Sequence, residues 1–534
     1  MKRHLLAVIL IVLPILGFSQ QQDAWVYLTD KQNVPAALAD PITILTQKAV
    51  DRKNAHGVVI DERDVPVNEN YISQLKAQSG ILVLAKSKWF NAVHIRGTET
   101  DINALFELSF VSSIDFADKS LNSSKSTQQK KASKLQETLT TFNYGSALNQ
   151  IQMFNGDQLH LADYTGTGMT VAVLDAGFPN VNAMTSFQRL RNGGHILSEY
   201  DFVNRDADVY TNTTSNHGTM VLSTMAGYVD NQYVGTAPDA DYYLFITEDG
   251  LNENPVEESY WVEAAERADS LGVDVINSSL GYGSFYDNPN YNYAISDFDG
   301  LTIYITRGAN IAYEKGLLIV NSAGNEDNAG VNAPADSQYV FSIGAVDASG
   351  NYASFSSVGS SMQPTQKPDV VAQGEASFVI NQNDVIGTAN GTSFSSPIMA
   401  GGIACLWQAL PNKTNTEIMQ LVRESASQYN NPDYFLGYGI PDLKLAFDNG
   451  TIQEEEFEDI NLYPNPTKEK VYFTIPSSEG VTNVLIFDIL GKLVFNINLD
   501  ENNNYIDLSS LSKGIYITKV KSKSILKSFK IIKY

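Results

Sequence analysis

The sequence predicts an α/β protein: a parallel sheet with helices on both faces, preceded by a small α+β unit and followed by a small β-sandwich. Two observations support this fold class. Residues 169–346 alternate short apolar segments with helical stretches, which is typical of a parallel sheet covered on both faces. Residues 460–534 contain short β-branched and aromatic segments separated by turns, which is typical of a sandwich. A length of 534 residues also exceeds a single domain and fits three or four units.

The N-terminus has the composition of a signal peptide. A basic start, Met1 to His4, precedes an apolar run from Leu5 to Phe18, and small residues follow near a cleavage point. The run is too short for a transmembrane helix. We therefore expect residues 1–20 to be a signal peptide.

The next unit, residues 21–140, combines strand and helix patterns with a polar end. Alternating apolar residues at 81–84 and 89–96 predict strands, and 99–108 predicts a helix. Residues 119–140 are rich in Ser, Gln, Thr and Lys, a composition that buries no core and predicts an exposed linker.

Three segments of residues 141–450 each place a reactive side chain next to an apolar element. Asp175 ends the apolar strand 169–175, His217 begins an apolar helix, and Ser393 follows the turn Gly391-Thr392 before another apolar helix. Taken singly, Asp175 and Ser393 are more simply interpreted as caps. The order of Asp175, His217 and Ser393 along the chain, however, is that of one of the known Asp, His and Ser triads.

The chemistry of peptide-bond cleavage needs these residue types. A serine hydroxyl is a poor nucleophile at neutral pH and requires a base that accepts its proton. An imidazole both takes that proton and returns it to the leaving amine. A carboxylate then orients the ring and stabilises its charged form. Only His217 among the six histidines opens a Gly-Thr helix.

These motifs resemble the subtilisin-like serine proteases, the subtilases, over residues of about 150 to 445. The resemblance implies a triad of Asp175, His217 and Ser393. It also implies that Asn325, in Asn321-Ser322-Ala323-Gly324-Asn325, completes the oxyanion hole with the Ser393 backbone N–H. The segment Ser279, Leu280 and Gly281 would bind the substrate backbone as an added strand.

Three residues leave the specificity open. Gln373 stands where the family usually has proline, and Phe394 replaces the commoner small or Met residue after the serine. Glu326, next to Asn325, is either at the rim of the primary specificity pocket, where it would favour basic side chains, or a solvated turn residue.

The resemblance also implies that residues 21–140 are a propeptide and linker that assist folding and block the cleft; an unrelated accessory domain is the alternative.

After residue 450, an acidic linker at 451–459 leads to the tail, residues 460–534. Its segments Leu462–Pro466, Ile486–Lys492 and Leu511–Tyr516 resemble the C-terminal sorting domain of the type IX secretion system of Bacteroidetes. This resemblance implies that the outer-membrane secretion machinery is a partner. It also implies that the protein passes through the periplasm of a Gram-negative bacterium and is secreted or held at the cell surface. A carbohydrate- or surface-binding module is the alternative.

Charge and composition limit which other partners, cofactors and metal ions the protein is expected to bind. The formal net charge of −24 argues against nucleic-acid binding, although the tail itself has ten lysines against six acids. The triad chemistry requires no cofactor. Subtilases often bind structural calcium, but no segment here has the regular oxygen-ligand spacing of such a site, so a metal site stays unknown. The single cysteine, Cys405, forms no intramolecular disulfide and lies in an apolar helix.

We therefore predict a secreted serine endopeptidase made as a zymogen, acting on protein or peptide substrates through an acyl-enzyme. The first alternative is a catalytically inactive protein of the same fold that binds at the cell surface. The second, an esterase or lipase of the α/β-hydrolase type, requires the order Ser, acid, His and the motif Gly-x-Ser-x-Gly. Neither is present.

Overall fold

The computed structural model describes residues 20–122, 142–211, 215–327, 330–451, 461–474, 481–489, 491–500, 503–521 and 526–534. The chain separates into two compact units, residues 1–451 and 452–534. Predictions for the signal peptide, the acidic linker and most of the polar linker fall outside the described residues. The first few linker residues are described, and Lys119–Leu121 form a 3-10 turn, η4.

The larger unit is built on a seven-stranded parallel sheet, as predicted, in the order β13-β12-β11-β10-β5-β9-β6. Its strands are short and apolar, and five of them are buried along their whole length. Their bounds are Thr170–Asp175 (β5), Ile196–Asp201 (β6), Asp241–Ile246 (β9), Val275–Ser278 (β10), Leu318–Ser322 (β11), Phe341–Val346 (β12) and Val370–Gln373 (β13).

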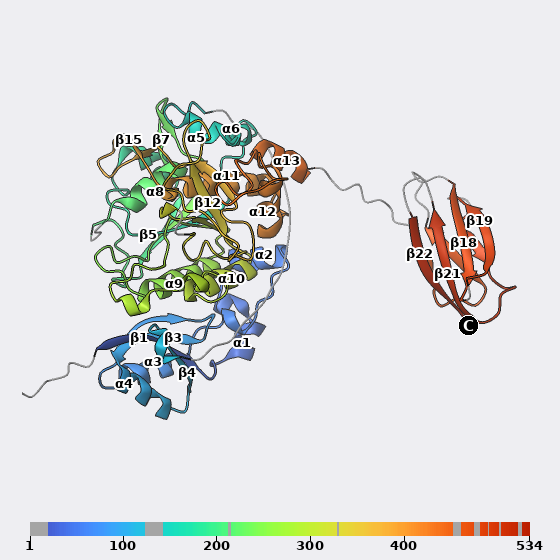
Figure 1. Ribbon diagram of the computed structural model, residues 1–534, viewed down its shortest axis with the longest axis horizontal. Helices are drawn as coiled ribbons and strands as arrows, with labels where there is room; N and C mark the ends of the chain where they lie inside the picture. The colour runs from blue at the N-terminus through green and yellow to red at the C-terminus, as the bar shows by residue number, and fades with distance from the viewer. Residues whose placement is uncertain are drawn as a thin grey trace, which may run out of the picture. The chain divides into compact units, whose positions relative to one another are not determined.

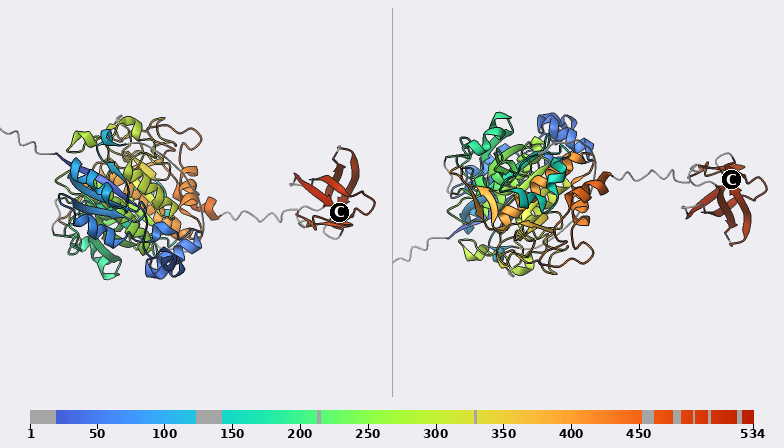
Figure 2. Two further views of the ribbon diagram at one scale, coloured as in Figure 1. Left: turned by 90° about the horizontal axis from the view of Figure 1, so that it is seen from below. Right: turned by 90° about the horizontal axis from the view of Figure 1, so that it is seen from above.

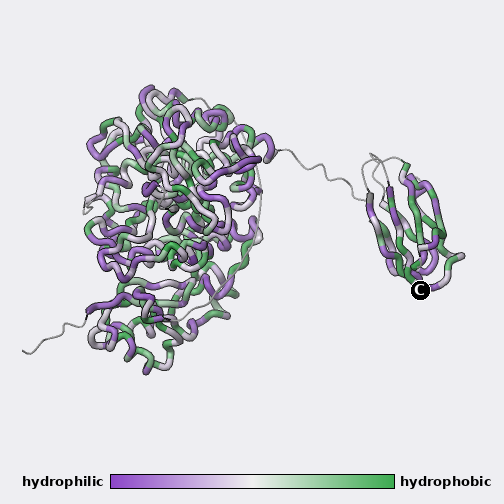
Figure 3. Tube along the Cα trace, in the orientation of Figure 1, coloured by the Kyte–Doolittle hydropathy of each residue, from purple (hydrophilic) through white to green (hydrophobic). Residues whose placement is uncertain are grey.

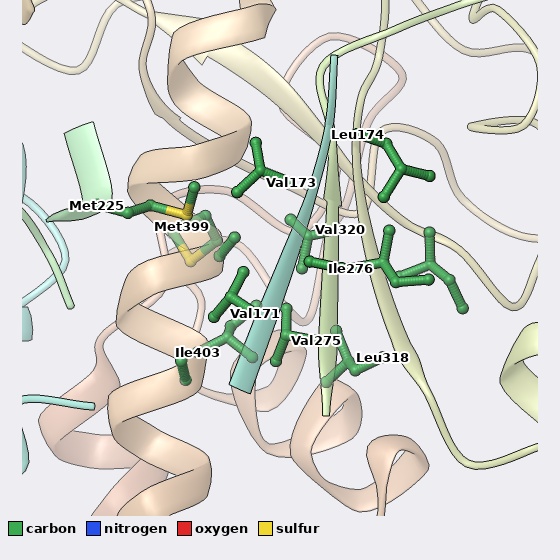
Figure 4. Close-up of a cluster of buried hydrophobic side chains, with 14 of the residues drawn as sticks. Val171, Val173, Leu174, Met225, Val275, Ile276, Leu318, Val320, Met399 and Ile403 are labelled. Atoms are coloured by element: carbon green, nitrogen blue, oxygen red, sulfur yellow. The ribbon is translucent and has the colours of Figure 1, made fainter. Parts of the chain in front are cut away.

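Helices cover both faces of this sheet (Figure 1). One layer contains α8 (His217–Ala226) and α11 (Thr392–Ala409), and the other contains α9 (Val256–Leu271) and α10 (Tyr304–Glu314). Because successive strand residues point to opposite faces, β5 contributes to both layers. Figure 4 shows Val171 and Val173 facing the helix that carries Met399 and Ile403, while Leu174 points the other way.

Many residues of this sheet are hydrophobic, and many residues of the outer loops are hydrophilic (Figure 3). The remaining elements of residues 142–451 are short. They are α5 (Leu148–Gln152), α6 (Gly156–His160), η5 (Thr185–Phe187), α7 (Gln188–Asn192), β7 (Tyr228–Val229), β8 (Tyr233–Val234), η6 (Pro289–Tyr291), η7 (Ile295–Asp297), β14 (Ser377–Ile380), β15 (Ile386–Ala389), α12 (Asn415–Glu424) and α13 (Leu443–Thr451). A capping box begins α12, with the Thr414 hydroxyl donating to Glu417 at 2.8 Å.

The N-terminal part is the predicted small α+β unit. Its antiparallel sheet has the order β2-β3-β1-β4, and its inner face packs on a core of its own. The other side of this sheet lies against α9 and α10 (Figure 1). The left view of Figure 2 shows the blue strands of this sheet from below. The elements are β1 (Gln21–Leu28), α1 (Val34–Ala39), η1 (Pro41–Thr43), α2 (Gln47–Ala55), η2 (Glu62–Asp64), α3 (Glu69–Lys76), β2 (Leu82–Ser87), β3 (Ala92–Thr98), α4 (Glu99–Ala104), η3 (Leu105–Glu107) and β4 (Val111–Phe116).

The C-terminal unit contains two antiparallel sheets, β16-β17-β20 and β19-β18-β21-β22. Buried residues of both sheets, among them Phe473, Ile486 and Val520, form one core, as expected for a sandwich. The strands are Asn461–Tyr463 (β16), Lys470–Thr474 (β17), Thr482–Asp488 (β18), Leu493–Leu499 (β19), Tyr505–Asp507 (β20), Gly514–Lys521 (β21) and Leu526–Lys533 (β22).

Candidate active site

The three predicted triad residues come from three elements that meet at one edge of the large sheet. Asp175 is the last residue of β5, a central strand, and its side chain is fully buried. His217 is the first residue of α8, and Ser393 is the second residue of α11. The carboxyl ends of the parallel strands form this edge, where α/β proteins place their functional groups.

Asp175 and His217 are directly bonded. The His217 Nδ1 atom lies 2.8 Å from Asp175 Oδ1 and 3.1 Å from Oδ2. Burial disfavours the charged imidazole, but the Asp175 carboxylate outweighs it, so the pKa of His217 is raised above its usual value. With the Nδ1 proton held by the carboxylate, the neutral ring has Nε2 free as a base.

The close approach of α8 to β5 depends on Gly218. A Cβ atom at this position would lie 2.5 Å from the Gly177 carbonyl oxygen and 3.0 Å from Asp175 Cβ, which is closer than side chains tolerate. The Thr219 hydroxyl also donates to the Pro179 carbonyl at 2.9 Å. The first turn of α8 is therefore fixed on the loop that follows β5, and this fixes the position of His217.

Ser393 lies in the first turn of α11, next to the chain that follows β10. Its hydroxyl donates to the Ser279 carbonyl oxygen at 3.3 Å, and the Ser279 hydroxyl donates to the Ser393 carbonyl at 2.9 Å. The ring of the next residue, Phe394, lies 5.8 Å from the His217 imidazole between centroids. In this structure the serine hydroxyl is thus bonded to a backbone carbonyl at the site, beside the Asp175–His217 pair.

Asn325 is held against the start of α11. Its Oδ1 atom accepts from the Thr392 backbone N–H at 2.8 Å and from the Thr392 hydroxyl at 3.0 Å. Because its oxygen is used in this way, the Nδ2 group is left as a donor, and a Cβ built on Gly391 would lie 3.7 Å from it. Gly391 itself has a φ of 144°, a conformation that favours glycine.

The segment Ser279 to Gly281 continues from β10 without pairing to another strand. Besides the contacts of Ser279 with Ser393, the Leu280 carbonyl accepts from the Asn321 side-chain amide at 3.0 Å. A Cβ on Gly281 would lie 2.8 Å from Asn332 Cβ, so this glycine permits a close approach of the neighbouring loop. The structure therefore brings all seven predicted site residues to the same edge of the sheet.

Glu326 is bonded to its own turn and to two neighbouring segments of the chain. One carboxylate oxygen accepts from the Asn325 N–H at 2.8 Å, from the Asn332 amide at 3.0 Å and from the Ser357 hydroxyl at 3.2 Å. These bonds orient the turn that presents Asn325. The Glu326 carboxylate therefore has a structural role, whether it also lies at the rim of the specificity pocket or is only a solvated turn residue.

Two further residues of the site were not predicted. Thr392 positions Asn325, and its signal was its place directly before the candidate serine. Glu248 follows β9, the neighbour of β5, and accepts a hydrogen bond from Tyr282. Burial raises the pKa of Glu248 to about 8, although the Tyr282 bond opposes this rise. Its signal was the acidic pair Glu248-Asp249 after an apolar strand.

Among the residues that the structure describes, no group of three or more His, Cys, Asp or Glu side chains is arranged so that it could hold a metal ion. Over the same residues, no helix combines the length and the apolar character needed to cross a membrane.

The α/β fold and the residues at this edge agree with the comparison with known families, which indicates a serine-type peptidase. The Subtilase family model, Peptidase S8, matches residues 166–439, and the chain belongs to this family. The Peptidase S8 propeptide domain of Bacteroidota matches residues 23–134. The secretion system C-terminal sorting domain matches residues 461–534, which indicates a secreted or cell-surface protein.

Individual relatives are similar over the peptidase part. The chain is 29% identical over 305 residues to Subtilisin NAT of Bacillus subtilis subsp. natto, covering 55% of this chain and 70% of the relative. It is 26% identical to Subtilisin DY of Bacillus licheniformis, covering 55% and 97%. Among solved structures, the prenylagaramide maturation protease PagA matches with a TM-score of 0.43 and 21% identity, covering 55% of this chain and 98% of that one.

Proposed function

We propose that the protein is a secreted serine endopeptidase in which Ser393 is the nucleophile, His217 the general base and Asp175 the residue that orients it. The observation that supports this most strongly is the Asp175–His217 bond at 2.8 Å beside the helix turn that carries Ser393. Membership of the subtilase family supports the same assignment.

The reaction begins when the Ser393 hydroxyl exchanges its bond with the Ser279 carbonyl for one with His217 Nε2. It then attacks the peptide carbonyl as the imidazole takes its proton, and a tetrahedral oxyanion forms. His217 returns the proton to the leaving amine, which leaves an acyl-enzyme on Ser393, and water hydrolyses this ester by the same steps. All groups are supplied by the protein, so no cofactor enters the proposed chemistry.

The oxyanion would be stabilised by two donors at the start of α11. One is the backbone N–H of Ser393, in the first turn of α11, where N–H groups have no partner in a preceding helical turn. The other is the Nδ2 group of Asn325, whose orientation is set by Thr392. Donors fixed before the reaction cost no reorganisation when the charge develops.

The substrate backbone would lie along Ser279 to Gly281 as an added strand. This segment continues from β10, has no strand partner in the described structure and contacts Ser393. Backbone pairing gives affinity with little side-chain selection, as a peptidase of proteins requires.

A labelling experiment tests the assignment. The wild-type protein should react covalently with a fluorophosphonate and cleave a peptide blocked at both ends, and Ser393→Ala should do neither. Ser395→Ala is the matched control: it removes a buried hydroxyl of the same helix that bonds the Thr392 carbonyl, and it should keep both activities. Wild-type protein that folds but takes no label would support the inactive surface-binding alternative.

The C-terminal domain would direct export. We propose that the type IX machinery recognises residues 461–534 after the chain has reached the periplasm, because this domain is joined to the peptidase as a separate compact unit. Self-cleavage in the linker near residues 123–141 would then separate the propeptide from the peptidase.

A further inference from the structure

The propeptide holds the peptidase at two separate surfaces. The first is the layer of α9 and α10, where the Ser87 hydroxyl and the backbone N–H groups of Lys88 and Trp89 donate to Glu266 at 2.5 to 2.9 Å. The second is formed by residues 46–64 of the propeptide, which include α2 and η2. We call residues 46–64 the clamp.

The clamp reaches the edge of the large sheet where the strands begin, opposite to the candidate active site. Lys48 pairs at 3.5 Å with Asp274, which directly precedes β10. The ring of His56 stacks on Trp407, near the end of α11, with 5.7 Å between centroids. Because Asp175 is at the other end of its strand, the clamp and the triad occupy opposite edges of the sheet.

A buried network of charges connects the clamp to the peptidase. Lys53 lies 2.7 Å from Asp269 at the end of α9 and 3.3 Å from Asp64, and all three side chains are fully buried. Lys315, which follows α10, lies 2.6 Å from Asp64 and is 1% exposed. Cations and anions thus alternate across the interface, and their side chains are buried.

Asp269 and Lys315, the two peptidase residues of this network, form their described ion pairs with the propeptide alone. Within the described residues, Asp269 forms ion pairs only with Arg52 and Lys53, and Lys315 only with Asp61 and Asp64. Every one of these partners belongs to the propeptide. Removing one member of a buried pair leaves an uncompensated charge, which is strongly unfavourable.

The polar contacts described for residues 20–122 do not reach the catalytic side chains. None of the described hydrogen bonds or ion pairs between residues 20–122 and the peptidase involves Asp175, His217, Ser393 or Asn325. The two anchoring surfaces are also joined by a short stretch of chain, so while one remains bound, the other rebinds at a high effective concentration.

We propose that the clamp makes residues 20–122 a lasting, non-covalent subunit of the active peptidase after the linker is cut. The proposal depends on the proposed function, because it concerns the processed, active form. Its partner surface is the strand-start edge of the peptidase, with Asp269 and Lys315 at its centre. The clamp would therefore be a structural part of the mature enzyme and not only an aid to folding.

The first test needs no catalytic activity. A recognition site for an added protease is placed in the linker of the full Ser393→Ala chain, which is cut after folding, and release of the 20–122 fragment is followed by size-exclusion chromatography. We expect the fragment to co-elute with the peptidase in dilute buffer and at about 1 M NaCl, because screening acts little on buried pairs. Separation of the fragment in either buffer would overturn the proposal.

Matched variants then assign retention to the clamp. Lys53→Met removes the central cation of the buried network and should speed release on the order of 10²-fold or more. Lys86→Met removes an exposed pair with Glu69 inside the propeptide and should change release by less than about threefold. Equal release rates for the two variants would contradict a role for the clamp. If Lys53→Met fails to fold, Arg52→Met, which removes the neighbouring buried cation that pairs with Asp269, takes its place and should likewise speed release.

The second test uses the self-processed wild-type protein. Fluorophosphonate label on Ser393 should be found in the fraction that contains an equal amount of the 20–122 fragment. Label only in fractions without the fragment would overturn the proposal, because the active form would then lack the subunit. Absence of label from every fraction would instead contradict the proposed peptidase function, which the first test does not require.

Discussion

At the scale of single residues, the electrostatics of the Asp175–His217 pair make the activity depend on pH. A general base must be neutral, and the carboxylate raises the pKa of His217, so activity should increase as the pH rises through a value above about 6.5. In Asp175→Asn the negative charge is lost. The ascending limb of kcat/KM should then move to lower pH, while kcat falls by roughly 10⁴-fold because the ring is no longer oriented. A limb that moves to higher pH, or stays in place, would show that Asp175 does not act on His217.

Asn325 provides a second test at this scale. Asn325→Ala should lower kcat by roughly 10²–10³-fold with the fold intact, because one oxyanion donor is lost. Steady-state kinetics with a circular dichroism control measures this. Asn332→Ala, which removes the amide that bonds Glu326, is the comparison and should cost far less. A loss of less than about threefold in Asn325→Ala would mean that Asn325 is not the donor.

At the scale of elements, the contact of α8 with β5 decides whether the pair forms at all. In Gly218→Ala the new methyl group would meet the Gly177 carbonyl at 2.5 Å, so α8 must shift and His217 with it. We expect kcat/KM to fall by about 10²-fold or more, because misplacement of a catalytic group by about 1 Å has that effect. Gly387→Ala is the control, since a Cβ there meets nothing within 4 Å. Similar kinetics for the two variants would rule out this packing constraint.

Comparison of the elements with the sequence patterns shows which helices and strands could be predicted from sequence alone. The apolar strand segments and a helix over 99–108 were predicted because each pattern is local. The structure divides that helix into α4, Glu99–Ala104, and the 3-10 turn η3, Leu105–Glu107. Inside the propeptide, the sequence predicted an α+β unit but gave no indication of the clamp. Residues 46–64 are mostly polar or charged, and the burial of Lys53 and Asp64 depends on partners more than 200 residues away, Asp269 and Lys315.

At the scale of the whole molecule, the two compact units predict separable functions. A chain that ends near Gly450 should keep full peptidase activity, because the core of the larger unit contains no residue of the tail. It should accumulate in the periplasm of its host, because the sorting domain is missing. Cell fractionation beside an activity assay measures both. Normal appearance of the shortened enzyme outside the cell would contradict the sorting role, and normal export with weaker attachment to an insoluble substrate would favour a binding module.

The sequence by itself determined the family, the order of the candidate triad, the three-part organisation and the sorting tail. These features depend on short motifs and on periodic burial, which neighbouring residues define. Only the tertiary structure decided that His217 bonds Asp175, that Thr392 orients Asn325, and that the clamp joins Asp269 and Lys315 in a buried network. The reason is physical: a hydrogen bond or buried ion pair between distant segments depends on distances of a few ångströms, and these exist only after the sheet and its helices have packed.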